Sequence, residues 1–282
     1  MNEKIKSLEQ NMQQRIVGKP DLIAAVITTL LAGGHLLLED VPGVGKTSLA
    51  KALADSLSLS FARIQCTPDT TPSDITGLSV YNPADRAFQI VPGPVVNCIV
   101  LADELNRTSP RTQSALLEVM EEHRVTIDGK PIPVPEPFMV RLSVGYPDPE
   151  AEEDMARRFL EGLLHSETRP VLTARDIAQM KDEVRKVTIH ESLRSYCVKI
   201  VESTRTKPEI SCGASPRALL AMLRYAQALA FMDNRAYCIP EDIAEAAART
   251  LPHRLILTAG ARLSRVTKEE MVRTILSQVK VP

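Results

Sequence analysis

The residues best suited to chemistry lie in the run LLLEDVPGVGKTS, at positions 36–48. Gly43 and Gly45 alternate in a turn that leads directly into Lys46, Thr47 and Ser48. Glycines at these places let backbone N–H groups approach a triphosphate closely, because no Cβ stands in the way. The lysine is then positioned for the β and γ phosphates, and the threonine hydroxyl for Mg²⁺. The run predicts a phosphate-binding loop with ATP and Mg²⁺ as its ligands.

One position departs from the strict loop pattern, which has glycine where this chain has Asp40. An acidic side chain beside phosphates is unfavourable unless it points away or binds another group. An ordinary glycine-rich turn is the alternative interpretation, but the apolar run before the loop and the helical pattern after it favour the phosphate loop. The residues expected to contact the nucleotide here are Asp40, Val41, Pro42, Gly43, Val44, Gly45, Lys46, Thr47 and Ser48.

A second candidate pair ends the apolar run in CIVLADELNR, residues 98–107. Asp103 and Glu104 follow a buried-strand pattern, and ligands of open α/β sheets bind at the carboxyl ends of the strands. Asp103 is suited to hold Mg²⁺, and Glu104 is suited to polarise an attacking water. A solvated strand end is the alternative, which the neighbouring loop makes weaker. Asn106 and Arg107 either face a neighbouring subunit or are simply solvated.

Arg217 lies in GASPRALL, residues 213–220, where Ser215 is the expected N-cap and Pro216 the first residue of a helix. A cation in the first turn opposes the helix dipole and loses about 0.3–1 kcal/mol. A catalytic role explains its presence, if the side chain reaches across a cleft to the γ-phosphate. A tolerated surface arginine is the alternative.

Residues 1–150 alternate short apolar runs with amphipathic stretches, which is typical of α/β proteins. The runs at 35–39, 61–66 and 98–102 predict parallel strands buried on both faces. Helices are expected over 21–32, from 46 to about 58 and from 110 to about 123, and a hairpin over 125–134. Residues 138–144 resemble one further buried strand.

After about residue 165 the pattern predicts helices only, over 174–186, 191–204, 216–232, 240–250 and 268–279. The expected architecture is therefore an α/β nucleotide-binding domain with a parallel sheet over residues 1–165. A smaller all-helical domain is expected over residues 166–282.

The composition is that of a soluble globular protein, with 44% hydrophobic residues, 24% charged residues and a net charge of −1. This balance gives no reason to expect nucleic acid or an anionic membrane as a partner. No apolar run approaches the ~20 residues of a membrane span, and the polar N-terminus lacks the apolar core of a signal peptide. The five dispersed cysteines, without a CxxC pair, favour reduced thiols. We therefore expect a cytoplasmic protein.

Together these residues resemble the MoxR family of AAA+ ATPases over nearly the whole chain. The runs that carry the resemblance are RIVGKPD, LLLEDVPGVGKT, FARIQCTPDTTPSDITG, FQIVPGPV, VLADELNRTSPRTQSALLEVMEE, VTIDGKPIPVPEPFMV, RLSVGYPDPEAE, SPRALL and LPHRLIL. Aspartate is familiar in MoxR-like chains at the position of Asp40. The resemblance implies an ATP-hydrolysing, chaperone-like protein that remodels or matures partner proteins.

The resemblance also implies roles for single residues. Val17 and Gly18 would border the adenine, Asp103 and Glu104 would form the Walker B pair, and Arg217 would be the sensor 2 arginine of the lid. The irregular segment at 67–97 and the hairpin at 125–134 would line the central pore of a homo-oligomeric, hexameric ring. Protein clients are implied, with von Willebrand factor A domain proteins among the candidates.

Family members carry a segment that this chain lacks between Val140 and Arg141. It holds the sensor 1 asparagine and a helix that ends in an arginine finger. Here no residue qualifies for either role, because Arg157 and Arg158 stand in another motif context. Either one sheet position beside the loop strand is empty, or the domain repacks. An internal deletion, an artefact of splicing or cloning, and a gap between joined segments are all compatible with the sequence.

The motifs and the missing segment are compatible with three functions. The full set of motifs favours an ATP-hydrolysing remodeller. The missing segment favours a nucleotide-binding scaffold or regulatory subunit deficient in hydrolysis, since arginine fingers contribute about 10³–10⁵ to turnover. A small-molecule kinase shares the loop, but the helical domain and the Asp-Glu pair favour an ATPase.

Overall fold

The computed structural model describes residues 3–38, 45–134, 141–142, 149–161 and 169–282. Elements of the first part are α1 (Glu3–Gln13), α2 (Pro20–Ala32), β1 (Leu37–Leu38), α3 (Lys46–Ser56), β2 (Phe61–Gln65), α4 (Pro72–Thr76), β3 (Gly77–Asn82), β4 (Ala87–Pro92), η1 (Pro94–Val96), β5 (Ile99–Asp103), η2 (Leu105–Arg107), α5 (Pro110–Glu122), β6 (Arg124–Ile127), β7 (Lys130–Pro133), β8 (Arg141–Leu142) and α6 (Pro149–Leu160). The remaining elements are α7 (Ala174–Lys186), α8 (Glu191–Thr206), β9 (Ile210–Cys212), α9 (Pro216–Met232), α10 (Pro240–Thr250), η3 (Pro252–Arg254), β10 (Ile256–Leu257), α11 (Ala259–Leu263) and α12 (Lys268–Gln278).

Capping residues explain why several helices begin where they do. Ser109 accepts a hydrogen bond from the N–H of Thr112 at 3.3 Å and precedes the proline that opens α5, as the sequence predicts. A reciprocal capping box joins Thr173 and Asp176 at the start of α7. Helix α2 begins at a proline and ends at Gly33, which adopts a left-handed φ of 69°.

The strands that flank the candidate site form two separate parallel pairs. Strand β1 pairs with β8, with Leu37 opposite Arg141, and β2 pairs with β5 in a register that sets Gln65 opposite Asp103. Among the described residues no strand connects the two pairs. The sequence left open an empty sheet position or a repacked domain, and residues 138–140, which bear on that choice, lie outside the described residues.

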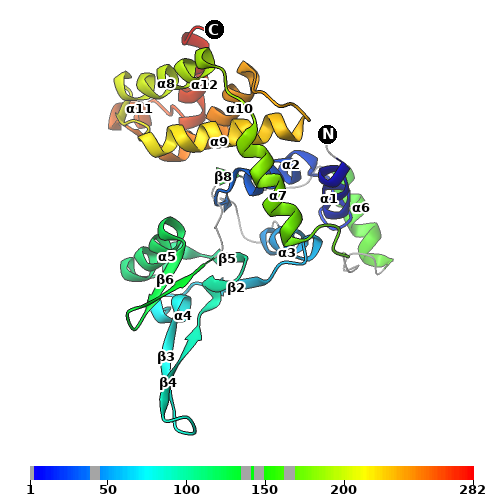
Figure 1. Ribbon diagram of the computed structural model, residues 1–282. Helices are drawn as coiled ribbons and strands as arrows, with labels where there is room; N and C mark the ends of the chain where they lie inside the picture. The colour runs from blue at the N-terminus through cyan, green and yellow to red at the C-terminus, as the bar shows by residue number, and fades with distance from the viewer. Residues whose placement is uncertain (1–2, 39–44, 135–140, 143–148, 162–168) are drawn as a thin grey trace.

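Strand β5 is half-buried and lies between two apolar cores. All five residues of β5 are only partly buried, whereas central parallel strands are normally buried on both faces. One apolar cluster joins α1–α3 to the helices from α7 onward, and a smaller one lies among β2, α4, α5 and β6 (Figure 1). Ile99 packs against the first cluster and Val100 against the second, so β5 lies at the boundary between the two cores.

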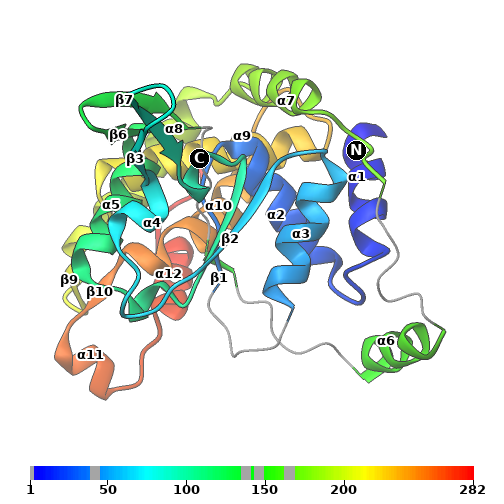
Figure 2. The same cartoon turned by 90° about the horizontal axis from the view of Figure 1, so that it is seen from below.

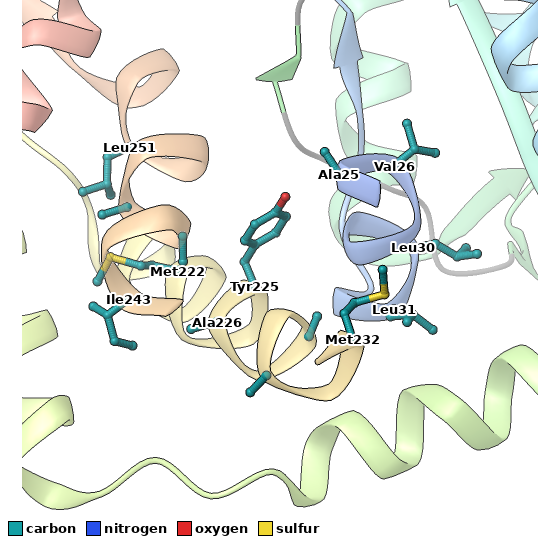
Figure 3. Packing of buried hydrophobic residues seen from close by; sticks show 14 of the residues in the cluster. Ala25, Val26, Leu30, Leu31, Met222, Tyr225, Ala226, Met232, Ile243 and Leu251 are labelled. Atoms are coloured by element: carbon teal, nitrogen blue, oxygen red, sulfur yellow. The ribbon is translucent and has the colours of Figure 1, made fainter. Parts of the chain in front are cut away.

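The larger core is centred on α9. Tyr225 is 2% exposed and lies between α2 and α10, as Figure 3 shows. Burial is the main reason why the pKa of its phenol rises to about 12. Helix α1 packs against both α2 and α3 (Figure 2) and completely buries Ile5, Leu8 and Met12.

No helix in the described part of the chain is long and apolar enough to cross a membrane.

Several expectations about local structure were wrong. The segment 67–97 is not irregular, because it forms α4 and the antiparallel hairpin β3–β4. The C-terminal part is not exclusively helical, since β9 and β10 form a short antiparallel pair. The predicted strand over 138–144 is described only at β8, and the rest of it lies outside the described residues.

A buried ion pair fixes the turn between α9 and α10. Both terminal nitrogens of Arg235 donate to the Asp242 carboxylate at 2.7 Å, and the N–H of Ile239 donates to it at 2.8 Å. We expect Asp242→Asn to lower the free energy of unfolding by about 3 kcal/mol, because an arginine with 20% exposure loses its buried counter-charge and keeps only the exposed Asp233. Urea unfolding measures this. The exposed pair Arg185–Asp182 supplies the control Asp182→Asn, for which we expect about 0.5 kcal/mol or less. Equal losses in the two variants would contradict a structural role for Asp242.

His35 predicts a pH dependence of stability. Burial is the main cause that lowers its pKa to about 4, and the charge of His123 adds to the effect, while the contact with the Met120 carbonyl acts in the opposite direction. In the unfolded chain the imidazole has its ordinary pKa of about 6.5. As pH falls from 6.5 toward 4, the unfolded chain therefore takes up a proton and the folded chain does not, so the folded state loses stability. We expect His35→Gln to remove about 2 kcal/mol of the change between pH 7 and pH 4.5. Parallel stability curves for the two proteins would contradict this assignment.

Candidate active site

Helix α3 begins at the end of the glycine-rich turn. Gly45 has a left-handed φ of 91°, and the first helical hydrogen bond runs from the N–H of Leu49 to the Gly45 carbonyl at 2.9 Å. A Cβ built on Gly45 would meet no atom within 4 Å, so the approach to the helix start is open in the described structure. This start fits a phosphate group, because its N–H groups and the helix dipole both favour an anion.

The predicted loop residues divide into two groups. Lys46, Thr47 and Ser48 form the first turn of α3, next to Gly45. The other predicted contacts lie outside the described residues; they are Asp40, Val41, Pro42, Gly43 and Val44.

Asp103 and Glu104 lie at the carboxyl end of β5, and α3 packs against that strand. The elements that carry the two predicted halves of the site are therefore in contact. Glu104 adopts a left-handed φ of 56°, which turns the chain from β5 into η2. A non-glycine residue in this conformation is uncommon, and such backbone strain clusters at functional sites. The side chains of Asp103 and Glu104 are 27% and 35% exposed, so both carboxylates are accessible from solvent.

Two residues on β2 that sequence reasoning missed contact these carboxylates. Arg63 donates to Oδ2 of Asp103 at 2.8 Å, and Gln65 donates to Oε2 of Glu104 at 3.1 Å. Their alternation in FARIQC was a signal that they share one face of the strand. The sequence did not show that this face meets the carboxylates, because that depends on the register between β2 and β5.

Arg107 lies 3.2 Å from Oε1 of Glu104 and is 60% exposed. Its charged group therefore has a partner within the chain while most of its surface is solvated.

Cys66, next to Gln65, is fully buried. Burial, followed by the charges of Asp103 and Glu104, raises the pKa of its thiol, so this cysteine stays protonated and unreactive at neutral pH.

Gly18 lies against α6 with a left-handed φ of 72°. A Cβ on Gly18 would stand 2.2 Å from that of Ala151, so the contact requires glycine. Arg158 of α6 donates to the carbonyl of Gln14 at 2.8 Å, which ties this helix to the segment that contains Val17 and Gly18. Arg157 pairs with Glu161 at 2.8 Å within and just after the helix.

Arg217 contacts the first part of the chain at a different place. Its guanidinium pairs with Glu121 near the end of α5, and the two side chains are 74% and 57% exposed. Its described ion pair is therefore with α5, and the contact of Arg217 with a γ-phosphate stays a prediction.

Comparison with known proteins identifies the family. Residues 35–155 match the ATPase family associated with various cellular activities (AAA), and residues 202–275 match the AAA lid domain. The chain is 42% identical to protein YeaC of Bacillus subtilis, over 97% of this chain and 93% of YeaC. It is 35% identical to chaperone MoxR1 of Mycobacterium tuberculosis, over 95% of this chain and 79% of MoxR1. The chain belongs to the MoxR family of AAA+ ATPases.

A solved structure confirms the fold of this MoxR chain. The crystal structure of a protein from Cytophaga hutchinsonii, assigned there to the ATPases, superimposes with a TM-score of 0.92 at 34% identity. The match covers 99% of this chain and 95% of the other. The predicted AAA+ α/β domain followed by a lid domain is confirmed, and the lid is mostly helical.

The alignment with YeaC also bears on the missing segment. It runs over 301 positions, which is more than the 282 residues of this chain. YeaC therefore contains residues that have no counterpart here, in agreement with a segment that the MoxR chain lacks.

The described residues fit the nucleotide and the metal that an AAA+ site takes. The start of α3 suits the phosphates, as argued above. The Asp103 carboxylate already attracts one cation, the guanidinium of Arg63, and carboxylate oxygens are the ligands that Mg²⁺ prefers. When bound, Mg²⁺ would neutralise charge on the phosphates, and Asp103 and Thr47 are the residues here that would hold it.

The pair Arg217–Glu121 predicts an effect on ATP affinity. If Arg217 turns to the γ-phosphate, it must first leave Glu121, and an exposed pair of this kind contributes about 0.2–1 kcal/mol. We expect Glu121→Gln to tighten binding of a non-hydrolysable ATP analogue about two- to fivefold and to leave ADP binding unchanged. Calorimetric titration measures both affinities.

Glu122 provides the matched control, because it is adjacent and pairs with Arg124 instead. Glu122→Gln should leave both affinities unchanged. The same gain in both variants would mean that general surface charge, and not release of Arg217, causes the effect.

Proposed function

We propose that this MoxR chain binds ATP with Mg²⁺, hydrolyses it and uses the energy to remodel or mature partner proteins. The observation that supports this most directly is the packing of α3 against β5. Helix α3 begins at Lys46, and β5 ends at Asp103, directly before Glu104. Its chaperone relative MoxR1 supports the remodelling role.

Each residue has a defined part in this proposal. The N–H groups after Gly45 and the Lys46 ammonium bind the phosphates, and Thr47 and Asp103 hold Mg²⁺. Glu104 accepts a proton from, or orients, the attacking water, which is the usual task of a carboxylate beside a transferred phosphoryl group. Arg217 leaves Glu121 and stabilises the charge on the γ-phosphate from the lid.

A second candidate is a nucleotide-binding scaffold or regulatory subunit that hydrolyses ATP poorly. The segment that this chain lacks between Val140 and Arg141 favours it, because in MoxR-like chains that segment carries the sensor 1 asparagine and the arginine finger, and the alignment with YeaC is longer than this chain. Loss of an arginine finger alone removes about 10³–10⁵ in rate, or roughly 4–7 kcal/mol of barrier stabilisation.

Two further parts of the proposal rest on the family alone: a homo-oligomeric, hexameric ring, and protein clients such as von Willebrand factor A domain proteins. A cytoplasmic location and a domain boundary near residue 165 rest on the sequence pattern. The hairpin β3–β4 suits a pore or a client contact, since it exposes Leu78, Tyr81 and Phe88. Its two aromatic rings pack edge to face with centroids 5.5 Å apart.

Phosphate release distinguishes the two candidates. If the chain hydrolyses ATP, we expect release to fall at least about 100-fold in both Lys46→Ala and Glu104→Gln. Glu104→Gln should still bind ATP, whereas Lys46→Ala should bind it weakly, because of these two residues only the lysine binds the phosphates. ATP binding without release above the Lys46→Ala background would reject the ATPase and leave the scaffold.

A further inference from the structure

Arg254, the last residue of η3, lies close to Arg217 in the lid. Its side chain is partly buried, and its Nε atom is buried with no hydrogen-bond acceptor among the described residues. No described carboxylate pairs with it, and the charge that acts on it is that of Arg217. Burial, followed by this neighbouring charge, lowers the pKa of the Arg254 guanidinium. An arginine nevertheless stays charged at neutral pH, so two like charges lie side by side in this part of the lid.

The register between β9 and β10 brings the two arginines together. The strands are antiparallel, with Ile256 opposite Cys212. The residues just before Ile256 therefore lie at the end of the pair where β9 leads into α9. Helix α9 carries Arg217 in its first turn. The proximity of Arg254 and Arg217 is thus a consequence of backbone pairing.

This part of the lid contacts the nucleotide-binding part of the chain. Helix α10, which leads into η3, contacts β8. Strand β8 in turn pairs with β1, the strand directly before the glycine-rich run. Arg217 itself reaches Glu121 of α5. Arg217 and the helix that leads to Arg254 therefore both meet the first part of the chain.

We propose that Arg254 is a second lid residue that binds the terminal phosphate of the nucleoside triphosphate, together with Arg217. The inference rests on the proposed function, since it assumes a chain that binds ATP. It assigns a role to an arginine in the run LPHRLIL, for which the family resemblance gave none.

Charge explains why the ligand of this pair is an anion. A guanidinium that is partly buried beside another cation loses hydration and is repelled, and both effects are unfavourable. A phosphate group between the two cations offsets both effects, and its oxygens are acceptors for the N–H groups of Arg254. The planar guanidinium also matches the geometry of a phosphate. Because ADP lacks the terminal phosphate, Arg254 should distinguish ATP from ADP.

Calorimetric titration of the full chain tests the inference without turnover. The two ligands are the β,γ-imido analogue of ATP and ADP, both with Mg²⁺. Arg254→Gln should bind the analogue at least about fivefold more weakly than the wild type, and ADP within about twofold, because a charge-assisted contact to the terminal phosphate is lost. Arg254→Lys keeps the charge and should lose less affinity. Arg262→Gln, at an exposed position of α11, is the control and should not differ from the wild type.

Unchanged affinity of Arg254→Gln for the analogue would overturn the inference. An equal loss of affinity for the analogue and for ADP would overturn it as well. If the wild type does not bind the analogue, the proposed function is rejected instead, so the two failures are distinguishable.

Urea unfolding of the nucleotide-free chain separates phosphate binding from a merely structural role. A partly buried arginine that is repelled by its neighbour does not stabilise the fold through its charge, so the urea midpoint of Arg254→Gln should equal or exceed that of the wild type. A lower midpoint together with weaker binding of both nucleotides would assign Arg254 to the fold of the lid and reject the inference.

A double-mutant cycle tests whether both arginines contact the same phosphate. Arg217→Gln, Arg254→Gln and the double variant are compared for their affinity for the analogue. We expect the two effects to deviate from additivity by at least about twofold, because groups that share one partner are coupled. Additive effects would mean that the two arginines act at separate places, and would reject the shared phosphate site.

Discussion

The parallel pairing of β2 with β5 is the interaction on which the candidate site depends. Its register sets Gln65 opposite Asp103 and so brings Arg63 and Gln65 to the two carboxylates. In the described structure this pair is not bonded to β1–β8. Among the described residues, the packing of α3 against β5 is the contact that joins the helix after the glycine-rich turn to the strand that ends at Asp103.

Local signals in the sequence were sufficient for much of the fold. Capping residues and apolar spacing placed α5, α7, α9 and α10 within a residue or two, because those signals act over a single turn. Helix α1 was not predicted, although Ile5, Leu8 and Met12 have helical spacing, because these three apolar residues are separated by polar ones. The hairpin β3–β4 was missed because its strands pair with each other and bury little of their surface.

The residues of the candidate site also fall into two groups, those that local signals predicted and those that they did not. Lys46, Asp103 and Glu104 were found because strand, loop and helix signals adjoin them directly. Arg63, Gln65 and the partnership of Arg217 with Glu121 were not, because each depends on contacts between elements distant in sequence. The segment lacking between Val140 and Arg141 was noticed only through the family resemblance, because no local signal in this sequence marks the junction.

Hydrogen exchange of the full chain with and without Mg-ATP is the most direct test of a nucleotide bound between α3 and β5. The account predicts slower exchange in two peptides at once, one over residues 45–56 and one over residues 99–107, with little change in α8 and α12. Protection of neither peptide, at nucleotide concentrations that saturate AAA+ relatives, would contradict it.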